Sequence, residues 1–185
     1  MTGSQEESAR AGNREPESET MASAARQKKP EPARAELSDQ ERALAAILRL
    51  RLAASLLAGD EALAGGRLDD AAAFLLEAAR LREEGQPALL LRSETGASGA
   101  ARRCLRLAVI NKDMPFLVDS IAATLAARGH AIDLLVHPVL PVRRRDGVLA
   151  GLPQGDGAGE KRESWVYLET DRVDARERRA LEAEL

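Results

Sequence analysis

The sequence has few of the residues that give a small protein its chemistry. Of its 185 residues, two are Phe, one is Trp and one is Tyr, and Cys104 is the single cysteine. One cysteine excludes an internal disulfide and any multi-cysteine metal site, and it fits a reducing cytoplasm. No apolar run approaches the roughly 18 residues of a membrane span, and the amino terminus lacks the basic and apolar regions of a signal peptide. We therefore expect a cytoplasmic protein without a membrane segment.

The charges are nearly balanced. There are 27 basic and 30 acidic residues, which leaves a net charge of -3 at pH 7. Nothing global therefore attracts the chain to nucleic acid or to an anionic membrane. The two histidines, His130 and His137, are too far apart in sequence to form a metal pair on one helix, so we expect no metal site.

The amino-terminal part divides into two regions. Residues 1–36 contain no Leu, Ile, Val or aromatic residue, so they cannot bury enough apolar surface to offset their ordering entropy, and we predict a disordered tail. Residues 37–86 predict a helical hairpin. Ser38 and Glu41 have the spacing of a capping box, apolar residues then recur at three- and four-residue steps in two segments, and Gly85 is placed to end the second helix.

Residues 87–185 change to a mixed pattern. The apolar runs "PALLLR" and "CLRLAVI" predict two strands, and the bend "NKDMP" leads into a helix that ends near Arg128. A long strand from Ala131 to about Val142 follows, then a Gly-rich connection, the strand "ESWVYLE" and a charged helix in which the sequence stops. From the second strand onward the order is β-α-β-β-α. We therefore predict an α+β, ACT-like or ferredoxin-like split βαβ sandwich that lacks its last strand and is truncated in its last helix.

Side-chain alternation predicts how this sheet is covered. Because successive strand residues point to opposite faces, one face should pack beneath the two helices and the other should be uncovered. The helix-covered face is expected to carry Leu105, Leu107, Val109, Ile132, Leu134, Val136, Val166 and Leu168. The opposite face is expected to carry Arg106, Asp133, Leu135, His137, Trp165 and Tyr167. Two aromatic residues on an uncovered face predict a contact with another domain, a second copy of the chain or the amino-terminal helical pair.

The bend between the second strand and the helix is the other candidate site. One interpretation is helix initiation, because Asp113 is favoured near the positive end of the helix dipole and Pro115 presets the first turn. The other interpretation is effector binding. We expect no catalytic residue in this chain. The effector-binding or interface candidates are Asn111, Asp113, Met114, Pro115, Phe116, His137, Trp165 and Tyr167.

Two motifs carry a family resemblance. The segment "RLAVINKDMPFLVDSIAATLAARGHAIDLLVHPVLPVRR", followed by "ESWVYLETDR", resembles the amino-terminal ACT-like region of the large bacterial NAD-specific glutamate dehydrogenases. In that family an N-x-D-M-P-F-L-V-D-S motif precedes a helix and a V-H-P-V strand follows, and both are present here, at residues 111–120 and 136–139. The resemblance covers residues 89–185, and more weakly the two preceding helices. Small amino-acid-binding ACT domains usually carry Gly where Phe116 stands, a difference that argues against amino-acid binding.

The resemblance implies a regulatory and assembly role within a larger enzyme. Members of the family oxidise L-glutamate to 2-oxoglutarate and ammonia with NAD, using a dinucleotide-binding domain and a catalytic Lys and Asp downstream of this region. This sequence has no G-x-G-x-x-G between a strand and a helix, so we expect no cofactor in this chain itself. The implied partners are other domains or subunits of the dehydrogenase, further copies of the chain and an amino-acid effector.

Two other function classes remain open. A free-standing ACT-type amino-acid sensor or protein-interaction module would use the same fold without a downstream enzyme. An RNA-binding module shares the β-α-β-β-α-β order and stacks bases on aromatic residues of an open sheet face, as Trp165 and Tyr167 would do. The net negative charge and the absence of a Gly-Phe pattern in "CLRLAVI" argue against RNA.

Overall fold

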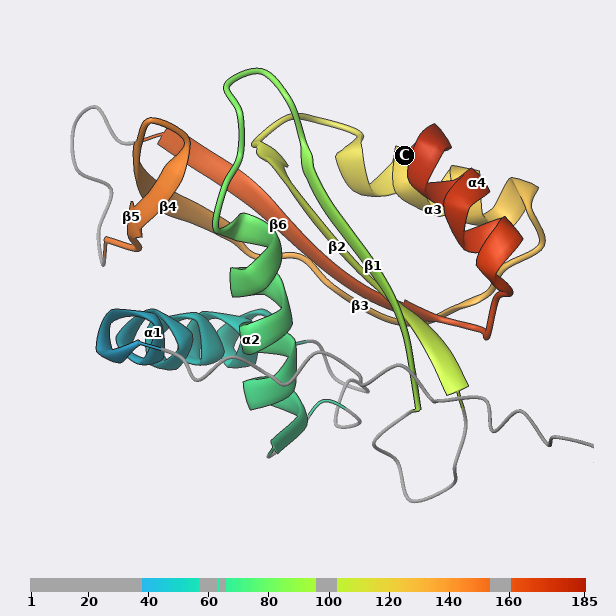
Figure 1. The fold of residues 1–185 in the computed structure, drawn as a ribbon, viewed down its shortest axis with the longest axis horizontal. Helices are drawn as coiled ribbons and strands as arrows, with labels where there is room; N and C mark the ends of the chain where they lie inside the picture. Colours follow the sequence, from blue (N-terminus) through green and yellow to red (C-terminus); the bar gives the residue numbers. More distant parts are fainter. Residues whose placement is uncertain (1–37, 57–62, 64–65, 96–102, 154–160) are drawn as a thin grey trace, which may run out of the picture. The chain divides into compact units, whose positions relative to one another are not determined.

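A computed structural model describes residues 38–56, 63, 66–95, 103–153 and 161–185. All of them belong to one compact unit, Glu36–Leu185, whose elements are shown in Figure 1. The predicted tail, residues 1–36, lies outside the described residues. The elements are α1 (Asp39–Ser55), α2 (Gly66–Ala79), β1 (Ala88–Thr95), β2 (Arg103–Lys112), α3 (Leu117–Ala127), β3 (Ile132–Val136), β4 (Val139–Arg145), β5 (Val148–Gly151), β6 (Lys161–Thr170) and α4 (Ala175–Glu184).

The first helix begins as the sequence predicts, but the second ends early. Ser38 Oγ accepts a hydrogen bond from Glu41 N at 3.3 Å, and Glu41 Oε2 accepts one from Ser38 N at 2.8 Å, so a capping box starts α1. α2 ends at Ala79, and Gly85 (φ 79°) lies beyond it in a separate turn. The chain leaves the helix before Gly85 because Leu81 forms a β-bridge with Val148.

The sheet is antiparallel throughout, in the order β1-β2-β6-β4-β5, with β3 also paired to β6. Where the sequence predicts one long strand, residues 137–138 separate β3 from β4. Pro138 has no N–H to contribute to a ladder, and its carbonyl oxygen accepts a hydrogen bond from Trp165 N at 3.0 Å. β3 therefore pairs with the second half of β6, and β4 pairs with the first half.

The short strand β5 is absent from the prediction, although the sequence carries its signal. Asp146 and Gly147 connect β4 to β5 with φ values of 51° and 79°. Two consecutive positive φ values are typical of the type I′ turn that joins two strands of a hairpin, and Asp-Gly is a preferred pair for it. The Gly-rich stretch that we interpret as a plain connection therefore begins with a hairpin turn.

β1 occupies the place of the strand that the β-α-β-β-α order lacks. In a complete βαββαβ sandwich the last strand lies beside the first. Here β1, which comes earlier in the chain, lies beside β2 and pairs with it antiparallel from Ala88↔Ile110 to Thr95↔Arg103. β2 is therefore paired on both sides, by β1 and β6, without any strand after α4.

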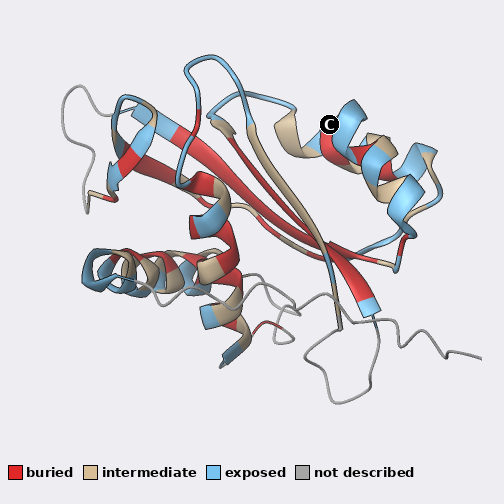
Figure 2. Cartoon of the chain, viewed as in Figure 1, coloured by how far each residue is buried: buried red, intermediate tan, exposed pale blue. Residues whose placement is uncertain are grey.

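An apolar core lies on each side of the sheet. Figure 2 shows the buried parts of the central strands and of the helix surfaces that cover them. On one side α3 and α4 contribute Ile121, Leu125 and Leu181, which pack on Leu105, Leu107, Val109, Val166 and Leu168. On the other side α1 and α2 contribute Leu44, Leu48, Leu52, Leu68, Phe74 and Leu75, which pack on Ala108, Ile110, Leu134, Val136, Trp165 and Tyr167. The protein is therefore a three-layer sandwich of helices, sheet and helices.

The prediction of which β3 side chains face which side of the sheet is wrong, because the alternation is shifted by one residue. Leu134 and Val136 lie in the core beneath α1 and α2, whereas Leu135 packs against the core beneath α3 and α4. The pairing Leu135↔Leu168 places these two side chains on the same face. Because three consecutive residues are apolar, either alternation buries apolar side chains, and the irregularity between Ile132 and Leu134 decides the register.

The face predicted to be uncovered is covered by the chain's own helical pair. Trp165 and Tyr167 are both 0% exposed and belong to the same core as α1 and α2. The ring of Phe74, on α2, meets the Tyr167 ring edge-on at a centroid distance of 6.1 Å. These rings are not available for stacking on RNA bases.

Candidate functional site at the turn between β2 and α3

The turn between β2 and α3 is attached to β6 by two hydrogen bonds of Asp113. Its backbone N donates to the Arg162 carbonyl oxygen at 3.1 Å, and its Oδ1 accepts from Ser164 Oγ at 2.8 Å. Asn111 supports the same turn locally, because its Oδ1 accepts from Lys112 N at 2.8 Å and its Nδ2 donates to Met114 Sδ at 3.6 Å. The backbone of the turn is therefore held in a defined position at the end of the sheet.

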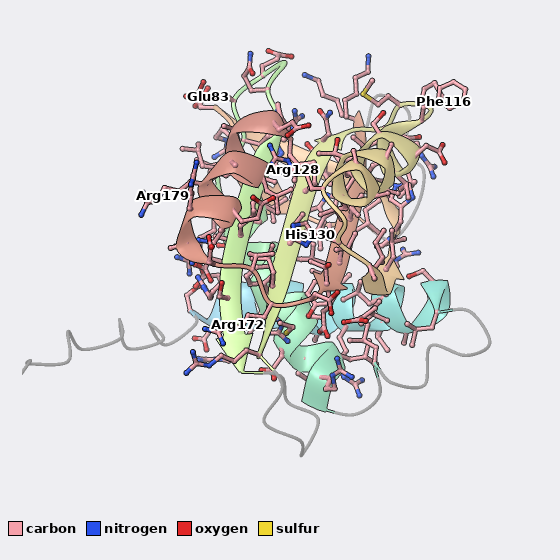
Figure 3. The ribbon with its side chains drawn as sticks, turned by 90° about the vertical axis from the view of Figure 1, so that its right-hand side faces the viewer. Glu83, Phe116, Arg128, His130, Arg172 and Arg179 are labelled. Atoms are coloured by element: carbon pink, nitrogen blue, oxygen red, sulfur yellow. The ribbon has the colours of Figure 1, made fainter. Side chains whose placement is uncertain are left out.

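Phe116 is the unusual residue of this turn. Its backbone lies in the left-handed region, with φ 64° and ψ 8°, and its side chain is 75% exposed. Figure 3 shows the ring extending outward at the start of α3. A non-Gly residue in this region is strained by about 1 kcal/mol or more. The chain thus keeps at this position the backbone conformation that Gly favours, with an aromatic side chain in its place.

The remaining groups of the turn also lie near solvent. Met114 is 50% exposed and Pro115 is exposed. No side chain caps the start of α3, so Asp113 serves as an anchor to β6, and the predicted role in helix initiation is left to Pro115 and Phe116. Because the Phe116 ring is largely exposed, its truncation should cost little stability.

His137 lies next to this turn and has an unsatisfied nitrogen. Its Nε2 is buried and has no hydrogen-bond partner among the described residues. Burial lowers the pKa of His137, while the charge of Asp113 acts in the opposite direction. His137 is therefore neutral near pH 7, and the structure brings it together with Asp113 although 24 positions separate them in the sequence.

Trp165 and Tyr167 do not join this site. Trp165 Nε1 donates to Glu163 Oε2 at 3.2 Å, and the Tyr167 hydroxyl donates to Glu169 Oε1 at 2.6 Å, both within the core beneath α1 and α2. Burial raises the pKa of Tyr167 far above its ordinary value, against the nearby charge of Arg106. Of the eight predicted site residues, the structure thus brings six to the turn and its surroundings and places two in the interior.

A buried ion cluster beneath α1 and α2 was not foreseen. Glu163 is 1% exposed and accepts hydrogen bonds from Arg82 Nε at 3.0 Å and from Arg144 Nε and Nη2 at 2.7 and 2.9 Å. Glu163 lies two residues before the buried Trp165 and therefore on the same face of β6, where a charged side chain must be paired. The cluster joins the segment after α2 to β4 and β6.

A second ion cluster joins α2 to β2 and β6. Arg67 Nη2 donates to Glu169 Oε2 at 2.7 Å, and Arg106 pairs with Glu94 and Glu169 at 2.5 and 3.7 Å. The guanidinium of Arg106 also lies 5.7 Å from the centroid of the Tyr167 ring. The face of the sheet that carries the aromatic residues is therefore attached to the helical pair by charge as well as by apolar contact.

No cluster of three or more His, Cys, Asp or Glu side chains suitable for a metal ion occurs in the part of the chain that the structure describes. None of the described helices is long and apolar enough to cross a membrane.

The strain at Phe116 leads to a first prediction. Phe116→Gly should raise the free energy of unfolding by about 1 kcal/mol, because Gly adopts a positive φ without a Cβ clash. Phe116→Ala should change it little, since the ring is largely exposed and the strain remains. Urea unfolding of both variants beside the wild type measures the difference. Equal stability of the Gly and Ala variants would show that the backbone is unstrained.

An antiparallel sheet in βαββα order, with α3 and α4 on one face and an anchored polar turn leading into α3, defines an α+β sandwich of the ACT-like, ferredoxin-like class. Comparison with known families then gives the particular assignment. The chain belongs to the family described as the ACT1 domain of glutamate dehydrogenase, which matches residues 58–185. This range includes α2 and β1, so the strand beside β2 is part of the family's domain.

Two curated relatives are both named NAD-specific glutamate dehydrogenase. The NAD-specific glutamate dehydrogenase of Pseudomonas aeruginosa is 45% identical over 78 residues, and that of Halomonas elongata is 39% identical over 69 residues. These alignments cover 40% and 36% of this chain but only 5% and 4% of the relatives. The chain therefore spans a small fraction of the length of the dehydrogenases it matches. No solved structure matches the chain.

Proposed function

We propose that this chain is the amino-terminal regulatory and assembly region of a large, cytoplasmic NAD-dependent glutamate dehydrogenase, and that catalysis takes place in a part of the enzyme outside it. The observation that carries the proposal is the family match over residues 58–185, together with two relatives that are NAD-specific glutamate dehydrogenases. NAD would bind to the catalytic part, which oxidises L-glutamate to 2-oxoglutarate and ammonia.

The architecture supports a role exerted through contacts. Both faces of the sheet are covered by helices, and the two buried ion clusters hold the layers together. The anchored turn with Phe116 and Met114 presents exposed side chains on a rigid scaffold, as a binding surface requires. Such a domain is suited to hold subunits together or to transmit an effector signal.

An exchange experiment in the Pseudomonas aeruginosa dehydrogenase tests the proposal. Replacing its matching region by residues 58–185 of this chain should retain subunit assembly and glutamate-dependent NADH formation, whereas deleting the region should abolish assembly. This chain alone should form no NADH with glutamate and NAD. A chimera that behaves like the deletion, or NADH formation that follows the isolated chain through purification, contradicts the proposal.

A free-standing amino-acid sensor is the second candidate, favoured by the Gly-like backbone of Phe116 and the unsatisfied Nε2 of His137 beside Asp113. Calorimetric titration of the isolated chain with L-glutamate and the other protein amino acids distinguishes the two. Two results together would favour the sensor. The chain would bind an amino acid saturably, with binding abolished by Asp113→Ala, and the dehydrogenase chimera would not assemble. Asp119→Ala, at an exposed position of α3, is the matched control.

A further inference from the structure

β1 forms the longest edge among the described strands of the sheet. It pairs with β2 through all eight residues without a register shift, and no described strand pairs with its other side. At the opposite side of the sheet the edges are short or interrupted. β3 and β4 are separated at residues 137–138, the pairing of β4 with β5 is irregular, and β5 has only four residues.

The side chains in the first half of β1 leave this part of the edge apolar. Leu89, Leu90 and Leu91 are each half-buried, with Leu90 on the side of α1 and α2 and the other two on the side of α3 and α4. Natural edges are usually blunted by a charge, a proline, a bulge or a covering segment, because unpaired N–H and C=O groups invite another strand. The described part of β1 has none of these devices within the leucine triplet.

From this edge we infer that two copies of the chain pair through β1, antiparallel and about a two-fold axis centred on Leu90, to form one continuous sheet. The inference rests on the assembly role proposed above and names its surface. The triplet is symmetric about Leu90, so this register places Leu90 opposite Leu90 and Leu89 opposite Leu91 of the other copy. Both half-covered apolar faces then continue across the axis, as the isologous contact of a dimer requires.

The charges of β1 are compatible with this register. Arg92 is already paired with Glu77 on α2, and Glu94 is already paired with Arg106 on β2. In a pairing centred on Leu90, Arg92 lies opposite Ala88 of the other copy, so no like charges meet. Both ion pairs form within one copy, so the pairing of the strands does not require either of them to break.

Sedimentation and disulfide trapping test the register. In a Cys104→Ala background, which removes the single native thiol, Leu90→Cys should convert most of the protein to a covalent dimer under mild oxidation. The two Cα atoms of a directly opposed pair lie about 4.5–5.5 Å apart, within disulfide reach. Arg92→Cys should not cross-link, because its two copies would lie four positions, or about 13 Å, apart along the strand. Leu50→Cys, 65% exposed on α1, measures random collision.

A second variant covers the case in which Leu90→Cys disturbs folding. Leu89→Lys places a charge at the edge and should return a sedimenting dimer to monomer while the thermal melt stays cooperative. A monomer at all concentrations, or a dimer that Leu89→Lys leaves intact, overturns the inference. These measurements use the isolated chain, so their outcome is independent of the chimera experiment. The chain can be monomeric although the dehydrogenase chimera assembles, and the chain can dimerise although the chimera does not assemble.

Discussion

Trp165→Ala is expected to lower the free energy of unfolding by about 3–5 kcal/mol. Trp165 is 0% exposed and packs in the core between the sheet and the pair α1 and α2. Truncation removes its apolar contacts, leaves a cavity and deprives Glu163 of the hydrogen bond from the indole Nε1. The packing of α1 and α2 on the sheet should then weaken.

Chemical denaturation with far-UV circular dichroism measures this loss, and limited proteolysis reports whether α1 and α2 detach first. Phe116→Ala is the matched aromatic truncation, because that ring is 75% exposed and should contribute little. If Trp165→Ala and Phe116→Ala were equally mild, α1 and α2 would not be packed on this face in solution.

Glu163→Gln is expected to destabilise the fold by about 3 kcal/mol, although it keeps the shape of the side chain. The change removes the negative charge that Arg82 and Arg144 share, and both guanidinium groups are largely buried, at 8% and 11% exposure. Buried cations without a counter-charge are costly, since the interior does not replace their hydration. Glu84→Gln, which breaks the exposed pair with Lys161, should change stability little and serves as the control.

The same variant has a defined pH dependence. Burial acts to raise the pKa of Glu163, but the hydrogen bonds and charges of Arg144 and Arg82 outweigh it and hold the pKa below the ordinary value of 4.5. The unfolded state therefore binds the proton first as pH falls, so this contribution is complete above about pH 4.5 and is lost as pH falls through the depressed pKa. The stability gap between wild type and Glu163→Gln should accordingly shrink in acid. A gap that stays constant from pH 7 to pH 3 would contradict this account.

Local patterns in the sequence were sufficient to predict most elements. Ser38 and Glu41 predicted the start of α1, because a capping box satisfies the free backbone N–H groups of a helix start with side chains within four residues. The motif from Asn111 to Ser120 placed the turn before α3 and carried the family resemblance that the match over residues 58–185 confirmed. These signals depend on residues that are close together in the sequence. They can therefore be recognised without knowledge of the tertiary structure.

The sequence by itself thus determined the α+β class, the order of most elements, the turn at Asp113 and the family. Only the tertiary structure decided that β1 takes the place beside β2, that Leu135 and not Leu134 faces α3 and α4, that α1 and α2 cover Trp165 and Tyr167, and that Glu163 pairs with two buried arginines. Each of these depends on residues far apart in the chain. Several arrangements of the strands and helices are compatible with the same side-chain alternation and composition. Packing and charge compensation in the folded chain select one of these arrangements.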